Sequence, residues 1–79
     1  MLEIYPNPSS TILNISFQSN SDFVDAYFQL VDITGKVILK RSLDSKNVEL
    51  NVSNIENGIY FVILNDNTSA LAKKILIQH

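Results

Sequence analysis

The chain has 79 residues, of which 46 % are hydrophobic and 18 % charged, and its formal net charge is −2. It has no cysteine and a single histidine, His79, which argues against a disulfide framework, a multi-histidine metal site and a Ser–His–Asp triad. The slightly acidic balance also argues against a nucleic-acid-binding module, which normally has a basic face. The longest apolar run covers residues 59–64, far less than the roughly 20 residues that cross a bilayer.

Residue usage favours β structure, since isoleucine is the commonest apolar residue and no window has a sustained helical period. Short apolar or alternating segments are separated by clusters of Asn, Ser, Asp and Gly. In chain order, the predicted strands are Leu2–Tyr5, Thr11–Gln18, Ala26–Asp32, Lys36–Leu43, Asn47–Val52, Ile59–Asn65 and Leu71–Gln78. Strands of this number and spacing predict a single all-β domain, either an antiparallel sandwich or a small barrel.

Two of the connections contain residues with specific backbone requirements. Pro6 and Pro8 cannot donate to a strand ladder, so they predict a bend at a sheet edge. Gly35 lies in the turn after the third strand and can adopt the positive φ that a tight hairpin needs. On the strand that follows, alternation places Val37 on the face opposite Ile38.

The segment from Ile55 to Tyr60 has an apolar residue, a turn that contains Gly58, and a tyrosine early in a strand. Immunoglobulin-like domains place a tyrosine similarly, with its hydroxyl bonded to the backbone a few residues upstream. We predict the same bond for Tyr60, anchoring a crossover between the sheets of an immunoglobulin-like β-sandwich; the alternative is that Tyr60 only packs. Residues 59–65 are apolar on both faces, which predicts a central strand covered on both sides.

Acidic and amide side chains gather in two predicted loops, at Asp22 and Asp25 and at Asn65–Asn67. A calcium ion needs six to eight oxygen ligands, and neither loop has the ordered spacing of a helix-flanked calcium loop. Turns that satisfy their own backbone are the preferred interpretation, with a calcium site as the alternative. The acids are scattered over turns and outward strand positions, so paired catalytic carboxylates, and enzymatic activity in general, are not expected.

The chain has two adjacent basic pairs, Lys40–Arg41 and Lys73–Lys74. A solvated strand face explains them, and lysine on an edge strand also discourages edge-to-edge aggregation. His79 is terminal and is expected to be mobile.

Three aromatic residues, Tyr5, Tyr27 and Phe61, are candidates for a sugar-stacking platform. Because nothing in the sequence places them on one exposed face, carbohydrate binding is kept only as an alternative.

Four segments occur in an informative order along the chain. They are Tyr5–Thr11, which begins Tyr-Pro-Asn-Pro, Leu30–Val37 around a glycine turn, Val48–Val62 with its Gly-Ile-Tyr, and Lys73–Ile77. Each is weak alone, but together they make the chain resemble, over essentially its whole length, the type A C-terminal sorting domain of type IX (Por) secretion cargo proteins of the Bacteroidota. The resemblance implies that residues 1–79 are one immunoglobulin-like domain from the C-terminus of a larger secreted protein.

The resemblance implies a non-catalytic secretion and sorting signal without a cofactor. Its partners would be the type IX translocon and shuttle proteins at the outer membrane, a sortase-like cysteine peptidase that processes the cargo, and the N-terminal cargo domain, with no nucleic acid and no transmembrane segment. The cargo would pass through the periplasm and end at the outer membrane, on the cell surface or outside the cell. The alternative is an accessory carbohydrate- or protein-binding module of a secreted enzyme.

The resemblance carries recognition over to ten positions of this sequence: Pro6, Asn7, Pro8, Gly35, Gly58, Tyr60, Lys73, Lys74, Ile75 and Ile77. Turns and the tyrosine corner already explain Gly35, Gly58 and Tyr60, so the candidate translocon contacts are those of the last strand, Lys73, Lys74, Ile75 and Ile77. An exposed last strand can offer backbone donors to a partner's sheet edge, and the two lysines add charge steering. Such a strand also permits dimerisation by strand exchange. The chain ends Gln78–His79, where a basic residue is expected near the end.

Overall fold

The computed structural model describes residues 2–6, 11–17, 26–43, 46–65 and 70–79. Within them lie seven strands, and each end is within one residue of its predicted position. The strands are β1 (Leu2–Tyr5), β2 (Ile12–Phe17), β3 (Tyr27–Asp32), β4 (Val37–Ser42), β5 (Asn47–Asn51), β6 (Gly58–Asn65) and β7 (Ala70–Ile77).

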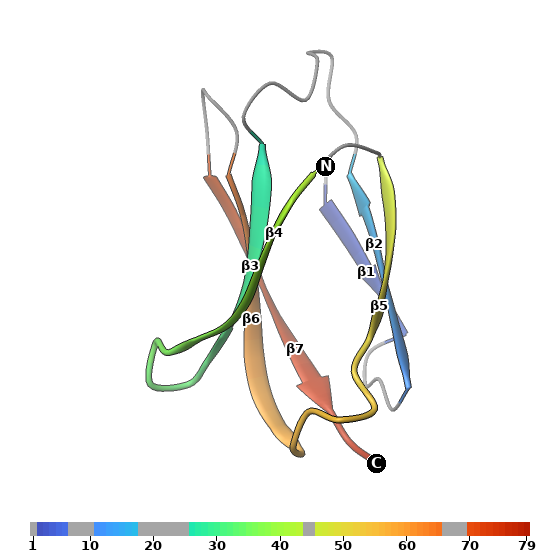
Figure 1. Cartoon of the computed structure of the whole chain (residues 1–79), viewed down its shortest axis with the longest axis vertical. Coiled ribbons are helices and arrows are strands. Elements are labelled where there is room, and N and C mark those ends of the chain that lie inside the picture. Colours follow the sequence, from blue (N-terminus) through green and yellow to red (C-terminus); the bar gives the residue numbers. More distant parts are fainter. Residues whose placement is uncertain (1, 7–10, 18–25, 44–45, 66–69) are drawn as a thin grey trace.

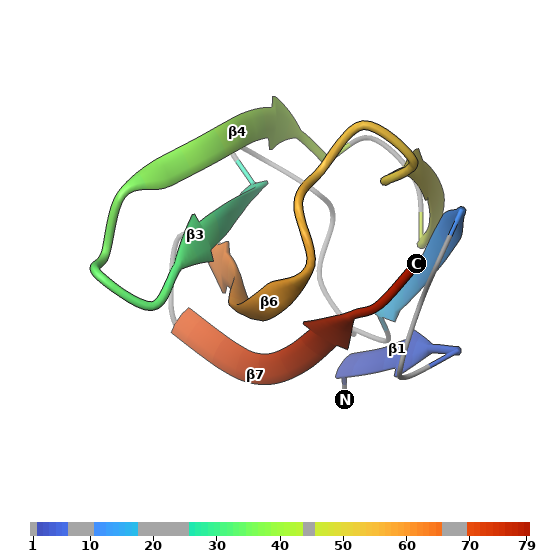
Figure 2. The same ribbon diagram turned by 90° about the horizontal axis from the view of Figure 1, so that it is seen from below.

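The strands form two antiparallel sheets that face each other as the layers of a sandwich (Figure 1). One sheet has the order β1-β2-β5 and the other the order β4-β3-β6-β7. Two separate sheets confirm the predicted β-sandwich and exclude the closed barrel. β1 lies beside β7 where the two sheets approach each other (Figure 2). Since β1 is an edge strand that ends at Tyr5, the predicted bend at Pro6 does lie at a sheet edge.

The core fills the space between the sheets with alternate residues of each strand, because successive side chains on a strand point to opposite faces. The largest fully buried side chains are Phe28, Leu13, Ile15, Leu30, Leu64, Ile75, Ile77, Val52 and Val62. Burying an aliphatic or aromatic side chain of this size contributes about 1.5–3 kcal/mol. The inward residues of the fifth strand, Val48, Leu50 and Val52, follow the predicted alternation.

The hairpin between β3 and β4 is closed around the carboxylate of Asp32. Its Oδ1 accepts hydrogen bonds from the Thr34 backbone N–H at 2.9 Å, the Thr34 hydroxyl at 2.6 Å and the Lys36 N–H at 3.0 Å. The Gly35 N–H donates to the Asp32 carbonyl at 3.0 Å, and Gly35 has a φ of 91°. The predicted positive φ at Gly35 is therefore confirmed.

A β-bulge interrupts the pairing of β3 with β4. Leu30 lies opposite Leu39, but the next residue, Val31, lies opposite Val37, so Ile38 is the additional residue of β4. Val37 and Ile38 are both exposed. The predicted strict alternation is wrong here, because a bulge sets two residues of one strand against one of its partner.

β6 pairs with β3 on one side and β7 on the other, which confirms its predicted central position. The expectation that both of its faces are covered is wrong. Tyr60, Val62 and Leu64 are buried in the core, but Ile59 on the opposite face is 39 % exposed. No described strand packs over that outer face, since the second sheet lies on the other side of β6 (Figure 2).

Candidate functional site

The connection from β5 to β6, residues 52–57, carries the chain from one sheet to the other, and we call it the crossover loop. It begins with a turn in which Oδ1 of Asn51 accepts hydrogen bonds from the Ser53 N–H at 2.9 Å and the Ser53 hydroxyl at 2.6 Å. The Ile55 N–H then donates to the Val52 carbonyl at 3.0 Å. An Asx turn of this kind satisfies the backbone where the strand ladder stops.

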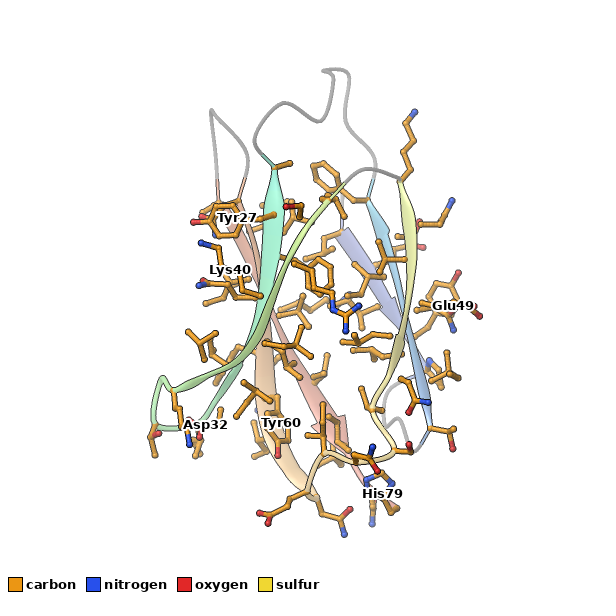
Figure 3. The ribbon with its side chains drawn as sticks, viewed as in Figure 1. Tyr27, Asp32, Lys40, Glu49, Tyr60 and His79 are labelled. Atoms are coloured by element: carbon orange, nitrogen blue, oxygen red, sulfur yellow. The ribbon has the colours of Figure 1, made fainter. Side chains whose placement is uncertain are left out.

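Tyr60 fixes the other end of the crossover loop. Its hydroxyl donates to the Glu56 carbonyl at 2.7 Å, and its ring is buried in the core (Figure 3). This confirms the predicted bond to the backbone upstream, and the alternative that Tyr60 only packs is wrong. Burial raises the pKa of the Tyr60 hydroxyl, and the negative charges of Glu56 and Asp32 add to the increase.

Gly58 is the first residue of β6, two positions before Tyr60. A Cβ added to Gly58 would lie 3.5 Å from Cε2 of Tyr60, which is an ordinary van der Waals distance. A small side chain at position 58 would therefore pack against the Tyr60 ring.

The C-terminal segment binds the same loop from outside. The His79 N–H donates to Oδ1 of Asn57 at 2.8 Å, and Nε2 of the His79 ring lies 2.6 Å from the Ile55 carbonyl oxygen (Figure 3). Because a carbonyl oxygen can only accept, Nε2 must carry the proton in this contact. The sequence predicts a mobile His79, whereas the structure gives it two partners on the crossover loop. No pattern in the sequence links position 79 to residues more than 20 positions earlier.

Several family motif positions gather at this end of the sandwich, where the crossover loop lies. Pro6 follows the end of β1, and Gly35 follows the end of β3, where Asp32 lies opposite Tyr60 (Figure 1). Gly58 lies opposite Ile77 at the end of β7. Asn7 and Pro8 lie outside the described residues. The sequence order alone does not reveal this clustering, because it depends on how the strands pair.

The four predicted recognition residues of β7 lie in three different environments: the outer face of the sheet, the edge of the inner face, and the core. Lys74 lies opposite Phe61 and points away from the core, whereas Lys73 lies opposite the fully buried Val62 and projects from the other face of the strand. Both lysines are exposed. Ile75 and Ile77 are 1 % and 0 % exposed, so their side chains hold β7 against the core.

The two basic pairs lie on the two edge strands of the four-stranded sheet, Lys40–Arg41 on β4 and Lys73–Lys74 on β7. The position fits edge protection. Nζ of Lys40 also lies 4.2 Å from the centre of the Tyr27 ring (Figure 3), a cation–π contact worth about 0.5–1 kcal/mol at an exposed site.

The three aromatic candidates for sugar stacking do not all share a face. Tyr27 and Phe61 both point outward from the four-stranded sheet, whereas Tyr5 belongs to the three-stranded sheet. The calcium candidates Asp22 and Asp25, and the loop residues that follow Asn65, lie outside the described residues. Elsewhere in the described part of the chain, no three acidic or histidine side chains come together in a group that could hold a metal ion. The same residues include no helix long and apolar enough to cross a membrane.

Comparison with known proteins identifies the family of this sandwich. Residues 3–78 match the family described as the secretion system C-terminal sorting domain. The chain belongs to this family, whose members act as secretion and sorting signals and are generally non-catalytic. A search of curated proteins finds no match.

A solved structure has the same fold. It is that of PorZ, described as an essential bacterial surface component of the type-IX secretion system of Porphyromonas gingivalis. The TM-score is 0.76 at 16 % sequence identity, and the match covers 99 % of this chain. The chain corresponds to 11 % of that protein's length.

Proposed function

We propose that residues 1–79 are the C-terminal domain of a larger exported protein and direct it through the type IX translocon across the outer membrane. The observation that carries this proposal is the family match over residues 3–78, which spans all seven strands. In this role the domain is a ligand of the secretion machinery.

The element we propose for recognition is β7. It bonds to β6 along one side, and its other side forms an edge of the four-stranded sheet, part of which lies beside β1. An edge strand can extend a partner's sheet through main-chain hydrogen bonds. The exposed Lys73 and Lys74 would steer an acidic partner toward it, while the buried Ile75 and Ile77 would keep the strand in register.

After passage through the periplasm, the cargo would reach the outer membrane and be released or held at the cell surface. A sortase-like cysteine peptidase would process it there, with the domain as substrate. Shuttle proteins at the outer membrane would be further partners. The same edge of β7 would allow two isolated domains to pair by strand exchange.

The experiment is a fusion of residues 1–79 to the C-terminus of a periplasmic reporter in a bacterium with a type IX system. We expect the reporter at the cell surface or in the medium, and a fusion that lacks residues 73–79 should remain in the periplasm. A known sorting domain on the same reporter is the positive control. Retention of the intact fusion in a strain that exports this control would refute the proposal, and export without residues 73–79 would refute the role of β7.

A further inference from the structure

The two outer faces of the sandwich differ in chemistry. On the three-stranded sheet, the outward residues of β1, β2 and β5 are mainly polar or acidic, and they include Glu3, Asn14, Ser16, Asn47, Glu49 and Asn51. Glu49 projects into solvent on this side (Figure 3). Such a face is typical of the solvent-facing side of an antiparallel sheet.

The outer face of the four-stranded sheet is apolar in its middle. By alternation with the buried residues of β3, β6 and β7, its outward side chains include Val31, Ile59, Phe61, Ile63, Ala72 and Leu76. Val31 is buried but lies outside the core cluster, which places it on this side of the sheet. We call this set the outer apolar face.

The charges that border the outer apolar face are cationic. Lys40 lies opposite Gln29 on the β4 edge, and Lys74 lies opposite Phe61 on the β7 edge. These edges are three strand spacings apart, or about 14 Å. Among the described strand residues that point outward from this sheet, there is no carboxylate. The outward carboxylates of the described strands, those of Glu3 and Glu49, lie on the other outer face, that of the three-stranded sheet.

We propose that the outer apolar face is a docking surface for a protein of the secretion machinery whose own contact surface is apolar at the centre and has carboxylates toward two opposite margins. The proposal rests on the proposed function and adds a second contact to it, on the face of the sheet and not along the strand edge of β7; Lys74 belongs to both contacts, whereas Lys40 belongs to the face alone. An apolar centre from which charges are absent, surrounded by a polar rim, is the usual composition of a protein interface. Lipid binding is less well supported, because anionic membranes are recognised by clusters of four to eight basic residues.

The test for the charged margin compares neighbouring residues of β4. Lys40→Glu reverses a charge on the outer apolar face, whereas Arg41→Glu makes the same change one position along, on the opposite side of the strand. In the reporter fusion, we expect Lys40→Glu combined with Lys74→Glu to lower the exported fraction about tenfold, and Lys40→Glu alone to lower it measurably. Arg41→Glu should stay within about twofold of the parent.

The test for the apolar centre compares two half-buried isoleucines on the two outer faces. Ile63 lies on the outer apolar face, and Ile12 lies on the outer face of the three-stranded sheet. Each is replaced by asparagine in a separate variant. Circular dichroism on the purified domains establishes that both variants fold; if Ile63→Asn does not, Ile63→Thr replaces it. We expect only the change at Ile63 to lower export.

Three outcomes would overturn the docking surface. The first is unchanged export of the Lys40 and Ile63 variants, provided that the parent fusion is exported; failure of the parent itself would refute the proposed function instead. The second is binding of the purified domain to phosphatidylglycerol vesicles that Lys40→Glu abolishes, which would assign the face to lipid. The third is a dimer in sedimentation that the same change dissociates, which would assign it to a second copy of the chain.

Discussion

The hydroxyl of Tyr60 donates a hydrogen bond to the carbonyl of Glu56 at 2.7 Å, across the point where the chain passes from one sheet to the other. The bond joins the first residues of β6 to the crossover loop. It therefore fixes the turn of the crossover loop against the first strand of the second sheet that the chain enters, β6.

Replacing Tyr60 by phenylalanine should lower the free energy of unfolding by about 1–2 kcal/mol. The ring would keep its packing, but the Glu56 carbonyl would lose its partner in a partly buried place. Urea unfolding of the purified domain measures the change. Tyr5→Phe, at a tyrosine that is 50 % exposed, is the control and should be neutral. Equal stability of Tyr60→Phe and the parent would show that the bond contributes nothing.

Protonation of the Asp32 carboxylate should lower the free energy of unfolding of the domain in acid. The hydrogen bond from the Thr34 hydroxyl is the largest cause that lowers the pKa of the Asp32 carboxyl, and the backbone N–H groups of Lys36 and Thr34 lower it further. The folded state thus binds fewer protons than the unfolded state, so the stabilisation is complete above the unfolded pKa of about 3.9 and disappears as the pH falls through the folded value.

The measurement is the free energy of unfolding at pH 6 and at pH 3 for the parent and for Asp32→Asn. The parent should lose more stability between the two values than the variant does. Glu49→Gln, at an exposed position on the other sheet, is the control for the general loss of a carboxylate. An identical pH dependence of Asp32→Asn and the parent would contradict the prediction.

Gly35→Val should destabilise the hairpin between β3 and β4 by about 1–3 kcal/mol. The cost comes from the backbone, because a φ of 91° disfavours a β-branched residue, whereas a Cβ at this position would meet no atom within 4 Å. Gly35→Asn should cost less, since asparagine tolerates positive φ. If thermal unfolding ranks the two variants equally, the conformational explanation is wrong.

His79→Ala should loosen the end of β7. The change removes the ring contact with the Ile55 carbonyl but leaves the backbone N–H bond to Asn57. We expect faster hydrogen exchange at the Ile77 amide and a loss of about 0.5–1 kcal/mol in unfolding free energy. The control is Gln78→Ala, at the exposed neighbouring position. Exchange as slow as in the parent would mean that the ring does not restrain the strand.

Local pattern was enough to predict the strands and the tyrosine corner. Alternation and turn residues placed every strand end to within one residue, and the spacing around Gly58 and Tyr60 predicted the hydroxyl bond. Both features depend on neighbours in the sequence, which is why the sequence reveals them.

Features that depend on pairing between distant strands were not predictable. Adjacent lysines on β7 point to opposite faces, and which of them faces outward follows only from the register with β6. The bulge at Ile38 and the contact of His79 with Ile55 likewise arise from tertiary structure. The apolar residues on both faces of β6 predicted that other parts of the protein pack on both faces, yet one face remains partly exposed. An apolar pattern shows that a face can be buried, but it does not show which element packs on it.

The central claim is that this sandwich is sufficient to direct export through a type IX system. The most direct measurement is the fraction of a reporter fused to residues 1–79 that reaches the surface or the medium, in a host strain and in the same strain without its translocon. The account predicts export in the first strain and periplasmic retention in the second. Equal distribution in the two strains would contradict it.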